Sequence, residues 1–221
     1  MLQPALGPPQ GATRPPATSV SRIDQVADLV AIYEDSRNVC VLRRDPVLAV
    51  ERFVRSVLRK EDRERTLRIR SEQIDAKELL AGQAEHPDAA AFVQEVRFLA
   101  QVYEDLTGAQ ELGLRLVSSH QAPCPRFHVD RVGVRMICTY CGPGTEFLCH
   151  EDVDRRWLGH RADGRPDEAS GLLRAPGAVQ RMRPFDIGLL KGISVNYFSG
   201  EPVSRAEARE VGDAWAPYRS V

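Results

Sequence analysis

Two side chains with metal-binding chemistry stand two residues apart in this sequence, His128 and Asp130. β-Forming residues surround them, and Gly142, Pro143 and Gly144 end the run with turn chemistry. On a strand, residues i and i+2 point to the same face, so one strand would present an imidazole beside a carboxylate. That pair is two-thirds of the triad of two histidines and one carboxylate that holds non-haem Fe(II). The pattern therefore indicates either a metal site or a structural His–Asp pair.

The chain offers few side chains to complete such a metal site. The histidines that follow the motif are His150 and His160, and both lie in residues 149–160, which we predict to form a short helix. A ligand on that helix would have to reach back across the turn to the predicted strand. On these residues alone, the third ligand is an open question.

A second metal-binding pattern starts at Cys138 and reads C-T-Y-C-G. A C-x-x-C-G run is typical of the first half of a zinc knuckle, because the glycine lets backbone amides turn toward the thiolates. A structural zinc needs four ligands, and neither Cys149 with His150 nor Cys124 with His120 has the usual spacing for the second pair. If Cys138 lies within a strand, its side chain and that of Cys141 point to opposite faces. We therefore expect unpaired cysteines and no zinc.

Arginines flank the His-x-Asp motif at Arg126, Arg131 and Arg135. A guanidinium near a metal could anchor a carboxylate through two parallel hydrogen bonds. The simpler interpretation is that these arginines are solvated partners of the many acidic residues of the chain. The sequence leaves both interpretations open.

Composition narrows the classes of function. The chain has 221 residues and a formal net charge of -1, which gives no overall electrostatic reason to bind nucleic acid or an anionic membrane. No apolar run is long enough to cross a bilayer, and residues 1–20 lack the basic and apolar regions of a signal peptide. The five cysteines are an odd number and make no disulfide framework. We therefore expect a cytoplasmic protein that acts on a small molecule or a protein substrate.

The first half of the chain reads as helices mixed with single strands. Residues 1–20 are rich in Pro and Ala, and we predict a disordered leader there. The strongest helical pattern covers residues 87–106 and ends before Gly108. Its apolar stripe consists of Phe92, Val96, Leu99, Tyr103 and Leu106. Shorter elements are predicted as helices over residues 24–33 and 46–60 and as strands over residues 38–43 and 66–70.

The second half of the chain reads as strands. From residue 112 the period of the apolar residues changes from 3.6 to 2, which is the change from helix to strand. Strands are predicted over residues 112–117, around His128, and over residues 134–140, 179–182 and 185–190. Residues 166–176 read as a loop. This order indicates an α+β fold with helices supporting an antiparallel sheet or barrel.

Two blocks of this sequence resemble a known family. One is the run CPRFHVDRVGVRMICTYCGPGTEFL, which contains the His-x-Asp motif, and the other is FDIGLLKG at residues 185–192. Both resemble the domain-of-unknown-function family 1826, an uncharacterised bacterial family, and the resemblance covers residues 24–192. That family is in turn similar to the cupin-type double-stranded β-helix of Fe(II)/2-oxoglutarate oxygenases.

The resemblance implies a fold, a site and a cofactor. The fold would be α+β, with helices packed on an antiparallel, cupin-like (double-stranded β-helix) core. His128 and Asp130 would be ligands of Fe(II), and Lys191, in the K-G of the second block, would anchor 2-oxoglutarate. Cys141 stands where the family has a basic residue, which makes the C-x-x-C run accidental.

The chain departs from the family after Gly192, where the family pattern calls for an H-R-S-P element and a last strand. Residues 193–221 contain no histidine, and Tyr218 begins only a faint echo of that element. We therefore expect one domain over residues 21–192 and a divergent tail over residues 193–221, produced by divergence, a frame change or truncation. The β-core would be incomplete at the C-terminus and the metal site would lack a third ligand. The candidates for that ligand are His150, His160 and Tyr218.

Three functional interpretations follow. The first is a protein resembling a non-haem Fe(II)-dependent oxygenase, with an incomplete metal site. The second is a non-catalytic, cupin-like binding or scaffold protein, and the third is a zinc-knuckle protein. In the purified protein, iron removable by a chelator would favour the first, absence of metal the second, and one zinc per chain the third.

Overall fold

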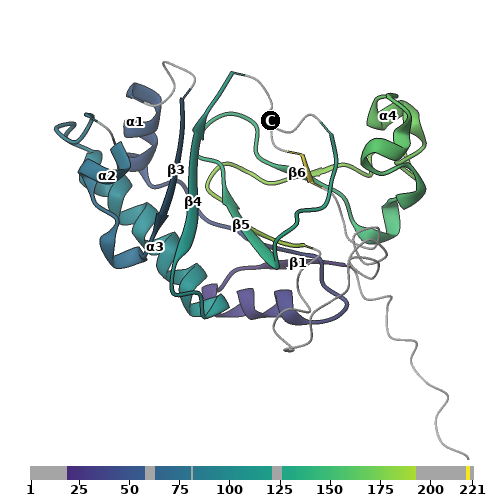
Figure 1. The fold of residues 1–221 in the computed structure, drawn as a ribbon, viewed down its shortest axis with the longest axis horizontal. Helices are drawn as coiled ribbons and strands as arrows, with labels where there is room; N and C mark the ends of the chain where they lie inside the picture. Colours follow the sequence, from purple (N-terminus) through teal and green to yellow (C-terminus); the bar gives the residue numbers. More distant parts are fainter. Residues whose placement is uncertain (1–18, 58–62, 81, 121–125, 193–217, 220–221) are drawn as a thin grey trace, which may run out of the picture.

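The computed structural model describes residues 19–57, 63–80, 82–120, 126–192 and 218–219. In these ranges the strands are β1 (Val20–Ile23), β2 (Val39–Leu42), β3 (Arg63–Ile69), β4 (Leu112–Ser118), β5 (Val134–Cys138), β6 (Glu146–Phe147), β7 (Gln180–Arg181), β8 (Ile187–Lys191) and β9 (Tyr218–Arg219). The α-helices are α1 (Leu48–Ser56), α2 (Ala76–Leu80), α3 (Ala89–Thr107) and α4 (Asp167–Ser170). The 3-10 helices are η1 (Val26–Tyr33), η3 (Ser71–Gln73), η4 (His150–Asp152), η5 (Arg155–Trp157) and η6 (Gly159–Ala162). The fold is α+β, as the change of period predicts, with α1 and α2 at one end and α4 at the other (Figure 1).

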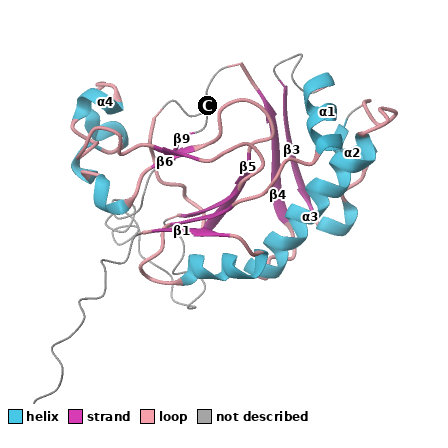
Figure 2. Ribbon diagram, turned by 180° about the vertical axis from the view of Figure 1, so that it is seen from behind, coloured by secondary structure: helices cyan, strands magenta, loops and turns pink. Residues whose placement is uncertain are grey.

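A four-stranded sheet in the order β1-β2-β8-β5 lies in the middle of the molecule (Figure 2). β8 pairs antiparallel with β2 and β5, whereas β1 pairs parallel with β2, so the sheet is mixed rather than purely antiparallel. The register brings Val20, Val39, Leu190 and Arg135 into one row across the four strands. Because cross-strand partners share a face, Arg135 lies on the same face as these three apolar residues.

Different layers cover the two faces of this sheet. One face packs on η1 and α3 through a cluster that includes Ile32, Ile187 and Leu189. On the other face, Leu190 packs in a cluster with Phe147 of β6, the middle strand of a β7-β6-β9 sheet. The sheet is therefore buried on both sides, which explains why β2 and β8 are almost wholly apolar.

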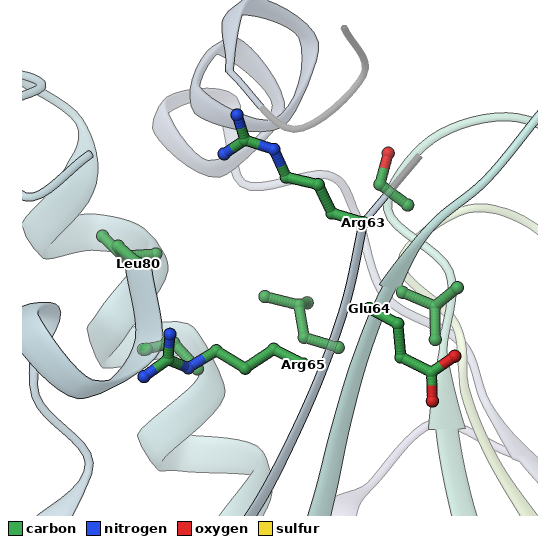
Figure 3. A pocket seen from close by; sticks show the side chains of 8 residues that line it. Arg63, Glu64, Arg65 and Leu80 are labelled. Carbon is green, nitrogen blue, oxygen red and sulfur yellow. The ribbon is translucent and has the colours of Figure 1, made fainter. Parts of the chain in front are cut away.

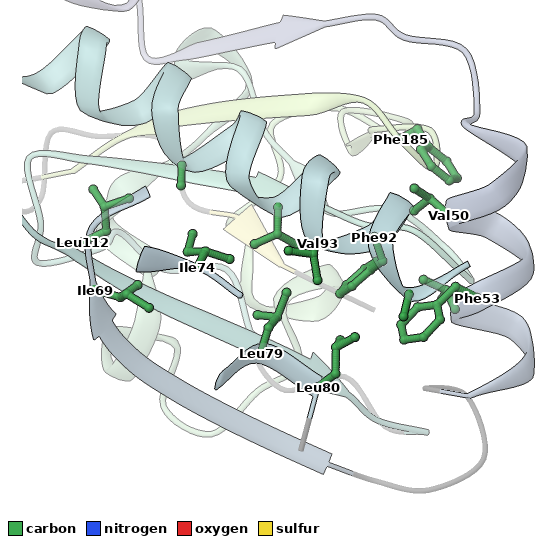
Figure 4. Packing of buried hydrophobic residues seen from close by; sticks show 14 residues of the cluster. Val50, Phe53, Ile69, Ile74, Leu79, Leu80, Phe92, Val93, Leu112 and Phe185 are labelled. Carbon is green, nitrogen blue, oxygen red and sulfur yellow. The ribbon is translucent and has the colours of Figure 1, made fainter. Parts of the chain in front are cut away.

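A second core lies between the β3–β4 pair and helices α1, α2 and α3 (Figure 4). Phe53 of α1 and Phe92 of α3 stack with 5.0 Å between their ring centroids. Ile69 and Leu112, which are opposite each other in the β3–β4 pair, belong to the same cluster. The opposite side of α3 contributes Leu99 to the cluster under the central sheet. α3 is therefore a wall shared by the two cores.

The longest helix agrees with its prediction. α3 ends at Thr107 and is followed by Gly108, whose φ of 68° is left-handed, a conformation that glycine adopts without steric cost. Phe92 and Val96 of the predicted stripe are buried, and its last three residues are partly buried. Among these, Tyr103 donates its hydroxyl to the carbonyl oxygen of Val134 at 2.7 Å, which ties α3 to β5.

Several local predictions were wrong. His128 forms only an isolated bridge and Asp130 has no strand pairing, so the predicted strand around His128 is absent. Residues 149–160 form separate 3-10 helices instead of one helix, and the predicted loop over residues 166–176 contains α4. Over the described residues the strands close no barrel. Residues 1–18 of the predicted leader and residues 193–217 of the predicted tail lie outside the described residues.

In the described part of the chain, no helix combines the length and the apolar character needed to cross a membrane.

Candidate functional site

The segment that carries the His-x-Asp motif is held at both ends. Before the motif, the ring of Phe127 is fully buried, and its backbone N–H donates to the buried carboxylate of Asp167 at 2.7 Å. After the motif, the backbone N–H of Gly192 donates to the carbonyl oxygen of Gly133 at 2.9 Å. α4 and the end of β8 therefore fix the backbone on which the two side chains stand.

The imidazole of His128 lies beside the carboxylate of Asp130. Its Nδ1 is 3.0 Å from the carbonyl oxygen of Arg126, and its Nε2 is 3.7 Å from Asp130 Oδ1. Because a carbonyl oxygen only accepts, the neutral ring carries its proton on Nδ1 and its lone pair on Nε2. A cation with ligand distances of about 2.1 Å can contact two donor atoms up to about 4.2 Å apart. The separation of Nε2 and Oδ1 therefore suits two ligands of one cation.

Arg135 holds the other oxygen of this carboxylate. Its Nε is 2.8 Å from Asp130 Oδ2, and the side chain of Asp130 is only 7% exposed. The guanidinium compensates the charge of the buried carboxylate and orients it, so that Oδ1 faces His128. Carboxylates that bind metals usually have such a partner outside the metal's own ligands, which orients them. Arg126, by contrast, forms an ion pair with Asp167 at 3.2 Å.

The structure does not bring His150 to the motif. The backbone N–H of His150 donates to Ser19 Oγ at 2.8 Å, and Ser19 directly precedes β1. β1 and β5 are the two outer strands of the central sheet, which places them three strand spacings, or about 14 Å, apart. The His150 ring contacts Arg155 through Nδ1. It therefore lies at the far edge of the sheet from Arg135.

The other two ligand candidates are placed only by their backbones. His160 belongs to η6, and Tyr218 belongs to β9, where it stands opposite Phe147. Among the residues that the structure describes, no three side chains of His, Cys, Asp or Glu lie close enough together to hold a metal ion. Within the described residues, the motif therefore brings together two such side chains, His128 and Asp130.

Lys191 points away from the motif. Its cross-strand partner is Val134, and its Nζ donates to the carbonyl oxygen of Glu34, directly after η1, at 2.9 Å. Arg135, the next residue along β5, faces the opposite side of the sheet because side chains alternate along a strand. Burial lowers the pKa of Lys191. The ammonium group therefore fastens the end of η1 to the sheet and is not brought beside His128.

Replacing Gly192 with alanine should displace the His-x-Asp segment. A Cβ atom at Gly192 would lie 1.9 Å from the carbonyl oxygen of Val132 and 2.7 Å from that of Asp130. Backbone atoms cannot yield as a flexible side chain does, so we expect a loss of about 1–3 kcal/mol in the free energy of unfolding. Gly113→Ala is the matched control, because a Cβ there meets nothing within 4 Å. Equal denaturant midpoints for the two variants would contradict this close approach.

The two cysteines of the C-x-x-C run have different surroundings. Cys138 lies at the end of β5 with its Sγ 3.6 Å from Arg44 Nη2. Cys141 packs against the apolar cluster of α1 and α3. A guanidinium beside Cys138 disfavours a second cation at that thiol, because like charges repel. The placement gives no support to a zinc-knuckle interpretation.

The thiols should react slowly in the folded protein. Burial raises the pKa of Cys40, Cys138 and Cys149 to about 11 from an ordinary value of 9.0. The thiolate is the nucleophile, so alkylation at pH 8 should be about a hundredfold slower than in the denatured chain. Timed labelling with iodoacetamide, read by mass spectrometry, measures this ratio at each cysteine. Equal rates for Cys138 in the folded and denatured protein would show that its thiol is not buried as described.

The same pKa values determine how the free energy of unfolding changes with pH. A folded-state pKa raised above the unfolded one means that the folded protein holds the proton more tightly. The stabilising contribution of these thiols is fully present below pH 9 and is lost as the pH rises through about 11.

Comparison with known proteins identifies the family. A family model described as "Protein of unknown function (DUF1826)" matches residues 23–203 of the chain. No curated protein and no solved structure matches the chain. The matched range contains both the His-x-Asp motif and the Lys191–Gly192 block, the two blocks on which the resemblance was based.

Proposed function

The chain belongs to the DUF1826 family of proteins of unknown function, and we propose that it is a metal-binding protein of the non-haem Fe(II) oxygenase type. His128 and Asp130 are the proposed ligands. The observation that carries the proposal is the paired presentation of His128 Nε2 and Asp130 Oδ1, 3.7 Å apart.

The contacts behind the two donor atoms support this assignment. The Arg126 carbonyl oxygen fixes the tautomer of His128, and the Arg135 guanidinium fixes the orientation of Asp130. Metal-binding histidines and carboxylates commonly have such partners, which orient the donor atoms before the metal arrives. A His–Asp pair with a purely structural role would more simply join Nε2 and Oδ1 by a direct hydrogen bond, and 3.7 Å is too long for one.

The surroundings of the pair suit oxygenase chemistry in outline. Bound Fe(II) would supply the activation of oxygen, with open coordination positions for oxygen and a co-substrate. The side chain of His128 is 35% exposed, which gives a ligand access from the solvent side. The buried Asp130 would keep one oxygen on Arg135 and offer the other to the metal. Use of 2-oxoglutarate rests on the resemblance, because the ammonium of Lys191 is engaged on the other face of the sheet.

Two protein ligands should hold the metal weakly. When the protein supplies only two donor atoms, water fills most coordination positions of the cation and a chelator can remove it. We therefore expect a Kd for Fe(II) weaker than about 1 µM. With the third position unfilled, we expect no oxygenase turnover. A bound cation without turnover corresponds to the non-catalytic interpretation of the same site.

Anaerobic titration with Fe(II), followed by calorimetry, tests the proposal. His128→Ala should weaken binding by about tenfold or more. His120→Ala, which removes an exposed histidine after β4, is the matched control and should leave the Kd unchanged. Asp130→Asn should behave like His128→Ala. Iron binding that survives both substitutions would refute the assignment of this pair as ligands.

Three further variants search for a third ligand in the same titration. His150→Ala, His160→Ala and Tyr218→Phe each remove one candidate donor. A tight site, with a Kd below about 1 µM, that one of these variants weakens would identify that residue as the ligand completing the site.

A further inference from the structure

The β3–β4 pair turns from apolar to cationic along its inner face. Near one end, Ile69 and Leu112 are buried in the second core. Since alternate residues of a strand share a face, that face continues along β3 through Leu67 to Arg65 and Arg63. Burial follows the same alternation, because Arg65 is less exposed than its neighbours on either side. The guanidinium of Arg65 therefore occupies a position where the pattern of this face would place a core residue, and the exposed Arg63 follows it at the end of the strand.

A pocket of ≈ 340 Å³ opens at this cationic end. Arg63 and Arg65 extend to the same side of β3, with Arg65 reaching toward the helix that bears Leu80, whereas Glu64 extends to the other side of the strand (Figure 3). Leu79 and Leu80, both almost fully buried, give the pocket an apolar wall. This volume is at the lower end of the range for small-molecule sites.

The carboxylates of Glu64 and Glu78 lie near this pocket. Glu64 accepts hydrogen bonds of 2.8 and 3.0 Å from Arg115, on the outer face of the pair. Glu78 forms an ion pair with Arg65, whose Nη2 lies 3.8 Å from Glu78 Oε2, beyond hydrogen-bonding distance. The side chain of Glu78 is 54% exposed, so it compensates the charge of Arg65 only in part. Among the residues that the structure describes, the buried Nε of Arg65 has no hydrogen-bond acceptor. A buried donor without an acceptor is costly, and an anion in the pocket would remove that cost.

We propose that this pocket binds a small amphiphilic carboxylate. The carboxylate oxygens accept hydrogen bonds from Arg65, with Arg63 adding a second positive charge, since the guanidinium fork matches a carboxylate in geometry. The hydrocarbon part of the ligand lies against Leu79, Leu80 and Leu116. This site belongs to the β3–β4 pair, which shares no strand with the sheets around the His-x-Asp motif. It is therefore independent of the proposed metal site.

Calorimetric titration of the full chain with octanoate tests the proposal. We expect a Kd of roughly 1 mM or tighter, as a ligand of this size allows. Octanol, which lacks the charge, and acetate, which lacks the chain, should each bind about tenfold more weakly. Absence of heat from octanoate at about ten times that concentration would overturn the proposal. Equal affinity for acetate or inorganic phosphate would also overturn it, because the site would then be a plain anion site.

Substitutions on one strand locate the binding site. Arg65→Gln removes the guanidinium but keeps a polar side chain, and it should weaken octanoate binding about tenfold. Arg68→Gln is the matched control, because Arg68 lies on the outer face of the same strand, 82% exposed and paired with Glu111. It should change the Kd by less than about twofold. If Arg65→Gln fails to fold, Arg63→Gln takes its place with the same expected weakening. Unchanged affinity in the folded variant would overturn the proposal.

Discussion

Replacing Glu95 with alanine should lower the free energy of unfolding by about 3–5 kcal/mol, as expected for a broken buried ion pair. Arg44 Nη2 is 2.6 Å from Glu95 Oε1, and Nη1 is 3.3 Å from Oε2. The side chains are 16% and 7% exposed, so removal of one leaves the other charged in a poorly solvated place. Arg44 also donates from Nε to the carbonyl oxygen of Phe185 at 3.0 Å. Loss of its partner should therefore loosen the turn before β8 as well.

Chemical denaturation of three variants separates this effect from simple truncation. Glu111→Ala breaks the exposed pair of Arg68 with Glu111 and should cost less than about 1 kcal/mol. The double variant Arg44→Met/Glu95→Leu removes both charges and should be less destabilised than Glu95→Ala. A Glu95→Ala variant as stable as Glu111→Ala would mean that the Arg44–Glu95 pair is open to water.

Phe92→Ala should cost about 3–5 kcal/mol by leaving a cavity in the second core. The ring is fully buried and lies between Phe53, at 5.0 Å, and Tyr140, at 5.5 Å between centroids. Phe98→Ala is the control on the same helix, because Phe98 is 41% exposed. It should cost less than about 1 kcal/mol, including its contact with Arg44 at 5.9 Å. Thermal and denaturant melts that give similar losses for both variants would show that the ring of Phe92 is not packed as described.

The spacing of apolar residues was enough to predict the elements whose pattern lies within one stretch of sequence. The stripe of α3 and its terminating Gly108 are visible in sequence because both follow from the geometry of one helix. Alternation likewise predicts β4, and the apolar run before Gly192 predicts β8. The change of period near residue 112 correctly indicated an α+β fold.

Long-range pairing could not be predicted from the sequence. The strand expected around His128 is absent, because its backbone is held by Asp167 and by the end of β8 rather than by neighbouring strands. The motif nevertheless places its two side chains together, since they are close along the chain. Whether Arg135 can contact Asp130 depends on the face of the central sheet on which Arg135 lies, and the pairing of β5 with β8 decides that face. No local pattern shows that Arg44 pairs with a residue 51 positions away.

The position of β8 between β2 and β5 has a consequence for biosynthesis. About 145 residues separate the end of β2 from the start of β8, its antiparallel partner. At roughly 5–20 residues per second, a ribosome needs about 7–30 s to make that stretch. For this time β2 can pair with β1 along one edge, but its other edge lacks β8, whereas α1, β3, α3 and β4 are all made early enough to assemble around the second core. One edge of β2 therefore stays unpaired until β8 is made, although β2 is among the first elements to leave the ribosome.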